Sequence, residues 1–297
     1  AVRPGTRLVL VGDVDQLPSV GAGSLLKDVI ASGVVEVVRL TEIFRQAQLS
    51  MIVTNAHKVN RGEMPVFNRN LVKGVDADFF FIREEDPEKV TELVRDLVAR
   101  RLPRYVKCNS IDDIQVMAPM RRTVTGVDNL NLLLREALNP GGRGKREIRM
   151  GLFILREGDK VMQIRNNYDK MVFNGDIGRV VKADPEEQEV VVAFDESDGL
   201  RRVKYEQHEL DELVLSYAIS VHKSQGSEYP VVVMPITTQH YVMLQRNLLY
   251  TAITRAKRMV VLVGTPKALA IAVKNDTQDM RYSGLNERLA CAVDTSS

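Results

Sequence analysis

The sequence predicts an α/β fold in which a parallel sheet with covering helices is interrupted by a small all-β barrel. Short continuous apolar runs, typical of strands buried on both faces of a parallel sheet, alternate with amphipathic helical segments. Between residues 158 and 205 the helical period disappears, and short β-rich runs replace it. The α/β alternation then resumes and continues to about residue 275. The barrel is therefore expected as an insertion within one α/β domain.

The elements before the barrel follow from apolar clusters and from helical periodicity. Strands are expected where apolar residues cluster, at 8–11, 34–40, 79–82 and 114–118. Helices are expected where apolar residues recur every three to four positions or a cap precedes the segment, at 24–31, 50–59, 87–101 and 127–138. The clearest helix is 87–101, because its apolar residues fall on one face and Pro87 stands in its first turn.

The elements within and after the barrel are marked by turn residues. Barrel strands are expected at 160–164, 177–182, 190–194 and 201–205, separated by turns such as Asn174-Gly175-Asp176. Beyond the barrel, strands are expected at 231–234 and 260–263, and helices near His222, at 245–256 and from Pro266. The polar, weakly patterned stretch that follows residue 275 is expected to be a tail.

Composition excludes several classes of site but indicates no partner. The 297 residues are 44% hydrophobic and 27% charged with a net charge of +2, which is typical of a soluble globular protein. Cys108 and Cys291 lack the spacing of a disulfide framework or a zinc site, and the four histidines lack metalloprotease spacing. No apolar run reaches the roughly 18 residues of a membrane span. Because the chain starts at Ala1 and runs directly into an apolar strand segment, we expect a portion of a longer protein.

Two glycine-rich segments fail as phosphate-binding loops. Residues 140–145 have Asn139 where the first glycine of the P-loop pattern would stand, Arg146 follows Lys145, and a helix precedes the segment. Residues 21–23 lack the third glycine of a dinucleotide fingerprint. Neither segment predicts a nucleotide site.

Two segments before the barrel place polar side chains where ligands bind in open α/β sheets. In residues 11–20 a predicted strand ends at Asp13, and Gln16 follows on the loop, where it can bind a water or a phosphate oxygen. In residues 40–46, Arg45 could neutralise charge that develops on a transferred phosphoryl group. The alternatives are a surface turn that caps a helix and an exposed arginine in a surface ion pair.

Two segments after the barrel complete the pattern. Residues 218–228 concentrate hydroxyl, imidazole and amide donors before a glycine and a strand, which suits contacts to phosphates. A polar helix cap is the alternative for this segment. In residues 250–258, Arg255 stands late in a predicted helix just before a core strand, at the edge of the sheet. A second arginine there could reach a nucleotide bound across a cleft.

Taken in order, these segments resemble the motifs of superfamily 1 helicases, and within them the RecD-like branch that moves 5′ to 3′. The matching segments, from motif III to motif VI, are 12–19, 40–46, 118–122 with 126–131, 222–228 and 250–258. The resemblance spans about residues 7–264 and implies a RecA-like motor fold with an inserted Src-homology-3-like barrel. The domains it implies are the end of a first RecA-like domain (1–40), a second RecA-like domain (41–154 and 207–275), the barrel (155–206) and a tail (276–297).

The resemblance also implies roles for individual residues. Gln16 would sense the γ-phosphate, and Arg45 and Arg255 would be the arginine fingers. The residues implied near the nucleotide are Asp13, Gly226 and Glu228. The residues implied to contact single-stranded DNA are Ser220, His222, Ser224 and Asn129. The cofactors would be ATP and Mg²⁺, and the partners would be single-stranded DNA, duplex junctions and other repair or recombination subunits. The expected location is the bacterial cytoplasm, at the nucleoid, and not the membrane.

One departure from the family pattern matters for activity. The Gly-rich P-loop and the strand-end Asp-Glu pair that hold ATP and Mg²⁺ lie upstream of motif III in this family, and this chain contains neither. We therefore expect the 297 residues to be inactive alone. Three other readings stay open: a non-catalytic helicase-like DNA-binding module, a subunit of a helicase–nuclease complex, and an unrelated phosphate-binding α/β domain. Arginine dependence of ATP hydrolysis distinguishes the first of these from a motor, and stabilisation by DNA but not by small nucleotides distinguishes the last.

Overall fold

A computed structural model gives the arrangement of most of the chain. It describes residues 3, 5–18, 21, 23–40, 49–68, 77–142, 144–150, 153–196, 199–277 and 283–294. Arg45, one of the expected catalytic residues, lies outside these ranges.

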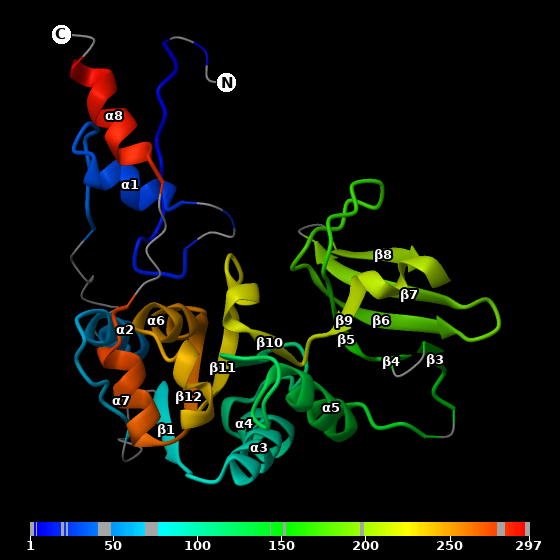
Figure 1. Ribbon diagram of the computed structural model, residues 1–297. Coiled ribbons are helices and arrows are strands. Elements are labelled where there is room, and N and C mark those ends of the chain that lie inside the picture. Colours follow the sequence, from blue (N-terminus) through cyan, green and yellow to red (C-terminus); the bar gives the residue numbers. More distant parts are fainter. Residues whose placement is uncertain are drawn as a thin grey trace.

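The centre of the molecule is a five-stranded parallel sheet (Figure 1). Its strands, in spatial order, are β1 (Phe79–Arg83), β12 (Ala256–Gly264), β11 (Tyr229–Ile236), β2 (Ile114–Ala118) and β10 (Ala218–Ser220). Two of the interior strands, β11 and β12, are buried over most of their length, which explains their runs of valine and other apolar residues. Four of the five strands were predicted from the sequence, and β10 lies in the polar segment before His222.

Helices cover both faces of this sheet (Figure 1). One apolar core lies between the sheet and α2 (Met51–Asn60), α6 (Arg246–Thr254) and α7 (Pro266–Lys274). A second core lies between the other face and α3 (Pro87–Asp96), its π-helical continuation Leu97–Arg101, α4 (Leu102–Val106) and α5 (Val127–Leu138). This two-sided covering confirms the predicted α/β class.

The helix starts also follow sequence signals. The Ser50 hydroxyl accepts a hydrogen bond from the Val53 amide at the start of α2, and the Thr265 hydroxyl accepts one from Ala268 at the start of α7.

A separate antiparallel sheet forms the barrel (Figure 1). Its strands, in spatial order, are β8 (Gly199–Tyr205), β7 (Glu189–Glu196), β6 (Ile177–Asp184), β5 (Lys160–Gln163) and β9 (Leu213–Leu215). A hairpin of β3 (Glu147–Met150) and β4 (Phe153–Arg156) precedes it, and the barrel has its own apolar core. The four predicted runs all form strands. The barrel was predicted to end at residue 206, and β9 was not predicted because its three residues are too few to show alternation.

The two strands predicted nearest the N-terminus are wrong for this structure. Residues 8–11 and 34–40 are extended but belong to no strand. Leu8, Val9 and Val11 are 67%, 80% and 93% exposed, respectively. An apolar run becomes a strand only when neighbouring strands satisfy its amide and carbonyl groups, and no described segment pairs with either run.

Two helices, one from each end of the described chain, lie side by side away from the sheet (Figure 1). Helix α1 (Leu25–Ala31), which was predicted, packs beside α8 (Leu285–Asp294). The Ser283 hydroxyl donates a hydrogen bond to the Asp28 carboxylate, which ties the two segments together. The segment expected to be a tail therefore contains a helix. Among the described helices, none is both long and apolar enough to cross a membrane.

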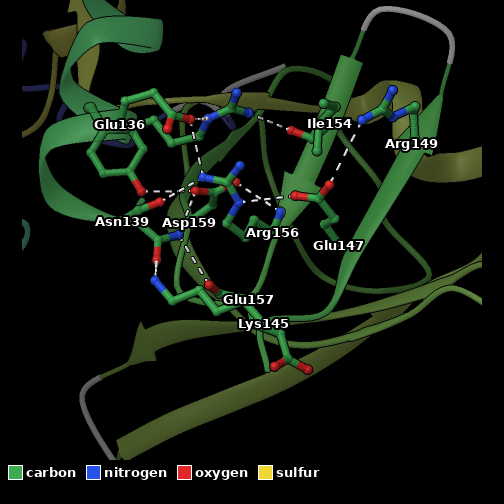
Figure 2. Close-up of polar contacts among 11 residues, drawn as sticks. Glu136, Asn139, Lys145, Glu147, Arg149, Ile154, Arg156, Glu157 and Asp159 are labelled. Carbon is green, nitrogen blue, oxygen red and sulfur yellow. Dashed lines mark hydrogen bonds and ion pairs between the residues drawn. The ribbon is translucent and has the colours of Figure 1, made fainter. Parts of the chain in front are cut away.

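A buried polar cluster joins the barrel to α5 (Figure 2). The Asp159 carboxylate is fully buried and accepts hydrogen bonds from the Asn139 side-chain amide at 2.8 Å, the Tyr217 hydroxyl at 3.0 Å and the Arg156 backbone amide at 2.9 Å. The Arg156 guanidinium pairs with Glu136 and Glu147, each at 3.2 Å. Burial raises the pKa of Asp159. Because most of these polar atoms find partners, the cluster holds the barrel in one orientation.

A second buried contact joins the barrel to the central sheet. The Lys160 ammonium on β5 donates a hydrogen bond to the Gln115 side-chain oxygen on β2 at 2.9 Å. The Gln115 side-chain nitrogen donates to the Ser216 and Tyr217 carbonyls, at 3.1 and 3.2 Å. Lys160 is buried, and burial lowers its pKa from 10.5 to about 8. The join therefore contains a cation without an ion-pair partner among the described residues.

We predict that Gly264→Ala strongly destabilises the protein. Gly264 ends β12 with φ +151°, and a Cβ atom there would lie 1.9 Å from the Ile236 carbonyl oxygen. Relief of that clash must displace backbone in the centre of the sheet, at a cost of about 3 kcal/mol or more. Gly142→Ala is the control, because a Cβ there meets nothing within 4 Å. Chemical denaturation would measure both, and equal losses would contradict the prediction.

Lys160 should give the stability of the protein a specific pH dependence. Its folded-state pKa, about 8, lies below the ordinary 10.5, so the cost of burying the ammonium is fully present below pH 8. As the pH rises from 8 to 10.5 that cost disappears, and the free energy of unfolding should gain about 3 kcal/mol. Lys160→Met should lack this gain. Lys89→Met, on the exposed face of α3, is the control. An identical pH dependence in wild type and Lys160→Met would contradict the assignment.

Candidate functional site

The loop that follows residues 8–11 docks on helix α6, far away in sequence. Leu17 is buried in the core under this helix, and its backbone amide donates a hydrogen bond to the Thr251 hydroxyl at 2.8 Å. The Tyr250 hydroxyl donates to the Asp13 carboxylate at 3.0 Å. Burial, followed by the nearby negative charge of Asp13, raises the pKa of Tyr250. The Asn60 side chain of α2 adds a contact to Asp15 at 2.7 Å.

This docking brings Gln16 and Arg255 into direct contact. The Arg255 guanidinium donates a hydrogen bond to the Gln16 side-chain oxygen at 3.0 Å, across 239 positions of sequence. The Gln16 side-chain nitrogen donates to Asp13 at 2.9 Å. Three residues that the sequence analysis singled out in two separate segments therefore form one chain of hydrogen bonds at the edge of the sheet.

Arg255 is held by neutral oxygens. It is the C-cap of α6, is only 9% exposed, and also donates to the Ser227 carbonyl at 3.2 Å. Its Nε atom is buried and has no hydrogen-bond partner among the described residues, and no described carboxylate forms an ion pair with it. A buried guanidinium that has an unpaired donor and no ion-pair partner among the described residues can bind an anion.

The segment 224–228 lies against both Leu17 and Arg255. The Gln225 side chain donates a hydrogen bond to the Leu17 carbonyl at 2.6 Å, and the Tyr229 amide donates to the Arg255 carbonyl at 2.8 Å. Gly226 has φ +84°, a conformation that favours glycine. Glu228 is exposed and pairs with Lys257 at 2.9 Å, which lowers the pKa of Glu228. The residues expected near a nucleotide thus lie around the Gln16–Arg255 contact.

Of the residues expected to contact DNA, Ser220, His222 and Ser224 lie at or just after the carboxyl end of β10, and Asn129 lies on α5. Ser220 ends β10 and is half-buried, and His222 follows it on a 3₁₀ turn and is exposed. Asn129, on the first turn of α5, is half-buried and donates to the Val124 carbonyl at 2.6 Å. Ser224 is fully buried, and its hydroxyl donates to the Val221 carbonyl at 2.8 Å. The Ser224 side chain is therefore not available to a ligand in this conformation and instead shapes the turn.

The loop after β2 lies at the same edge, because Ala118 of β2 pairs with Ser220 of β10. It carries exposed Arg121, which pairs with Asp128 at 3.1 Å. Buried His240 contacts the Thr125 hydroxyl of this loop through its Nε2 atom at 2.9 Å. Burial lowers the pKa of His240 to about 4, so it is neutral at neutral pH. His240 thus positions a loop that carries cationic side chains.

Sequence reasoning missed three residues that organise the site: Tyr250, Thr251 and His240. The first two belong to a segment that was singled out, but only for its arginine. Thr251 and Arg255 are four positions apart and so share one face of α6, and this spacing was the available signal. His240 stands outside every motif, and its contact with a loop more than one hundred residues earlier has no local signature.

Comparisons with known proteins find matches to the barrel, to the segment that follows it and to the N-terminal segment. A family described as the SH3 domain of ATP-dependent RecD-like DNA helicases matches residues 130–194. A UvrD-like helicase C-terminal domain matches residues 215–263, and an AAA domain matches residues 1–76. The ATP-dependent RecD2 DNA helicase of Deinococcus radiodurans is 35% identical over 97% of this chain and 37% of its own length. This chain belongs to the RecD-like helicases.

Other relatives of this RecD-like chain include the RecBCD enzyme subunit RecD of Mycolicibacterium smegmatis, 29% identical over 97% of the chain and 50% of that protein. The chain thus spans about a third to a half of the length of these curated relatives. A crystal structure of Pif1 helicase from Bacteroides in complex with ADP-AlF3 and single-stranded DNA aligns with 96% of this chain and 65% of that one, at 15% identity and a TM-score of 0.47.

We predict that Thr251→Val releases the Gln16 loop from α6. Valine has the shape of threonine but cannot accept the Leu17 amide hydrogen bond, and an unsatisfied buried amide costs about 1–3 kcal/mol. Amide hydrogen exchange at Leu17 should rise roughly tenfold. Ile253→Val, a buried change on the same helix, is the control and should not affect Leu17 selectively. Unchanged exchange at Leu17 in Thr251→Val would show that the hydroxyl does not hold the loop.

Proposed function

We propose that this chain is the C-terminal motor portion of an ATP-dependent DNA helicase, which couples ATP hydrolysis to 5′-to-3′ movement along single-stranded DNA and to duplex unwinding. The observation that carries the proposal is the contact between Gln16 and Arg255. It joins the loop at 13–18 to a buried guanidinium whose Nε donor has no partner among the described residues, an arrangement that can recognise the γ-phosphate of ATP and stabilise charge developing on it.

The site suggests a division of labour among its residues. Gln16 can exchange its bond to Arg255 for one to the γ-phosphate or to the attacking water, and Asp13 orients its amide group. Arg255 supplies positive charge to the transferred phosphoryl group, a role that we also propose for Arg45. Gly226 and Glu228 border the same space. ATP would be bound with Mg²⁺, which supplies positive charge at the phosphates, chiefly through parts of the complete protein beyond this site.

The carboxyl edge of β10 and β2 is the proposed path of single-stranded DNA. Ser220, His222 and Asn129 offer donors there, and exposed Arg121 provides charge for phosphates. Contacts of this kind bind the DNA backbone without recognising the base sequence. Duplex junctions are the proposed substrate for unwinding, other repair or recombination subunits are the proposed partners, and the bacterial cytoplasm at the nucleoid is the proposed location.

We also propose that the 297 residues do not hydrolyse ATP alone. They contain no G-x-x-x-x-G-K-[ST] sequence, so no described or undescribed part of them can form the P-loop cradle. Measurable ATP hydrolysis by the purified 297-residue chain would refute this part of the proposal.

ATP hydrolysis by the complete protein, with and without single-stranded DNA, tests the function. We expect DNA to stimulate hydrolysis, and Arg255→Ala to reduce kcat about 10³-fold, as loss of an arginine finger does. Arg258→Ala, an exposed arginine on β12 whose guanidinium contacts the Val106 carbonyl, is the control and should retain most activity. If DNA stimulates hydrolysis and Arg255→Ala hydrolyses ATP as fast as the wild type, Arg255 is not an arginine finger. DNA binding without any hydrolysis would favour a non-catalytic binding module.

The direction of movement needs a substrate with a single-stranded tail at one end only. We expect the complete protein to unwind a duplex with a 5′ tail and to leave the same duplex with a 3′ tail intact. Strand release followed by gel electrophoresis measures both. Preference for the 3′ tail would retain the motor proposal but overturn the proposed direction.

A further inference from the structure

We infer that Lys223 is a positioning residue that couples the barrel hairpin to the nucleotide side of the motor. Its ammonium donates a hydrogen bond to the Asn174 side-chain oxygen at 2.6 Å. Lys223 lies on the 3₁₀ turn that follows β10, and Asn174 lies in the hairpin 165–176 that connects β5 with β6. The inference rests on the proposed function, because it takes Gln16 and Arg255 as the residues that respond to ATP.

On the barrel side, Asn174 is held in place by the hairpin itself. Its backbone amide donates to the Asn166 side chain at 2.9 Å, and the neighbouring Gly175, with φ +108°, donates its amide to the Gln163 carbonyl at 2.9 Å. The Phe173 amide donates to the Asp176 carboxylate at 2.7 Å. The Asn174 backbone is therefore held within the hairpin, and a displacement of Asn174 is transmitted to the hairpin.

The same hairpin presents apolar side chains to solvent. Tyr168 is 70% exposed, and Met171 and Phe173 are also exposed. The Tyr168 and Phe173 rings pack edge to face with centroids 6.0 Å apart. A movement of Asn174 would carry this exposed aromatic pair with it.

On the motor side, Lys223 begins a short segment whose later residues contact the nucleotide side. Lys223 is half-buried, forms no ion pair with a described carboxylate, and has a pKa lowered by burial. Two positions later Gln225 binds the Leu17 carbonyl, and two further on the Ser227 carbonyl accepts from Arg255. Five consecutive residues thus reach from the barrel hairpin to the arginine.

The other polar contacts between the barrel and the motor, among the described residues, lie away from this segment. The Asp159 cluster, the Lys160–Gln115 contact and the Arg179–Asp112 ion pair, at 2.6 Å, contact α5, β2 and the residues just before β2. None of these contacts involves segment 223–227. When Arg255 and Gln16 change partners on ATP binding, a shift in that segment reaches the barrel through Lys223.

A double-mutant cycle in the complete protein tests the coupling. Lys223→Met, Asn174→Ala and the double variant are compared for ATP hydrolysed per base pair unwound. Each single variant should raise that ratio about fivefold, and the double variant should be no worse than either single variant. Lys170→Met, which removes a barrel-internal contact to Glu209, is the control and should combine additively with Asn174→Ala. Additive effects of Lys223→Met and Asn174→Ala would overturn the inference.

Amide hydrogen exchange provides a readout that does not need catalysis. Asn174→Ala should raise exchange at the Ser227 amide about threefold, although that amide binds the Ser224 carbonyl in the motor domain. Gln16→Ala should in turn raise exchange at Gly175. If Asn174→Ala changes exchange only in the barrel and Gln16→Ala changes it only in the motor, the coupling does not exist. Cross-effects in a protein without ATP hydrolysis would leave the coupling intact and remove the proposed function instead.

Discussion

The site depends on one physical constraint, the burial of the Arg255 guanidinium without a carboxylate partner among the described residues. A buried cation costs free energy unless its donors find acceptors, and here those acceptors are the Gln16 side chain, the Ser227 carbonyl and the neighbouring Thr254 hydroxyl. The first two oxygens come from the loop at 13–18 and from the segment 224–228. Because the arginine needs both, it draws two distant segments to one end of α6.

The parallel sheet makes that arrangement possible. Arg255 stands between α6 and β12, and β12 lies at the centre of the sheet beside β11. The backbone of Arg255 accepts from the first residue of β11, Tyr229, so the guanidinium is anchored to the most buried part of the fold. The polar side chains of Asp13 and Gln16 are therefore arranged around a fixed charge, which favours preorganised electrostatics over an adaptable surface.

Much of the fold could be predicted from the sequence, because the burial of side chains produces a pattern of apolar residues over a few neighbouring positions. The valine runs of β11 and β12, the one-sided apolar face of α3 and the turn residues of the barrel all act over a few positions. The same rule misplaced strands at 8–11 and 34–40, since an apolar run does not reveal whether a partner strand exists. In the site, residue types predicted Gln16 and Arg255 as candidates, but their contact across the chain could not be predicted. Thr251 and His240 were missed because their partners lie more than one hundred positions away.

Two kinds of polar contact join the barrel to the motor, and their burial suits them to different tasks. The Asp159 cluster is desolvated, so loss of one partner leaves another polar group buried and unpaired, and the cluster resists opening. The Lys223–Asn174 contact is different, because Asn174 is exposed and Lys223 only half-buried. If that bond opens, water can replace it at little cost. A barrel held rigidly at its base and reversibly at its hairpin can pivot by a small amount, and the hairpin is the part that carries the exposed aromatic pair.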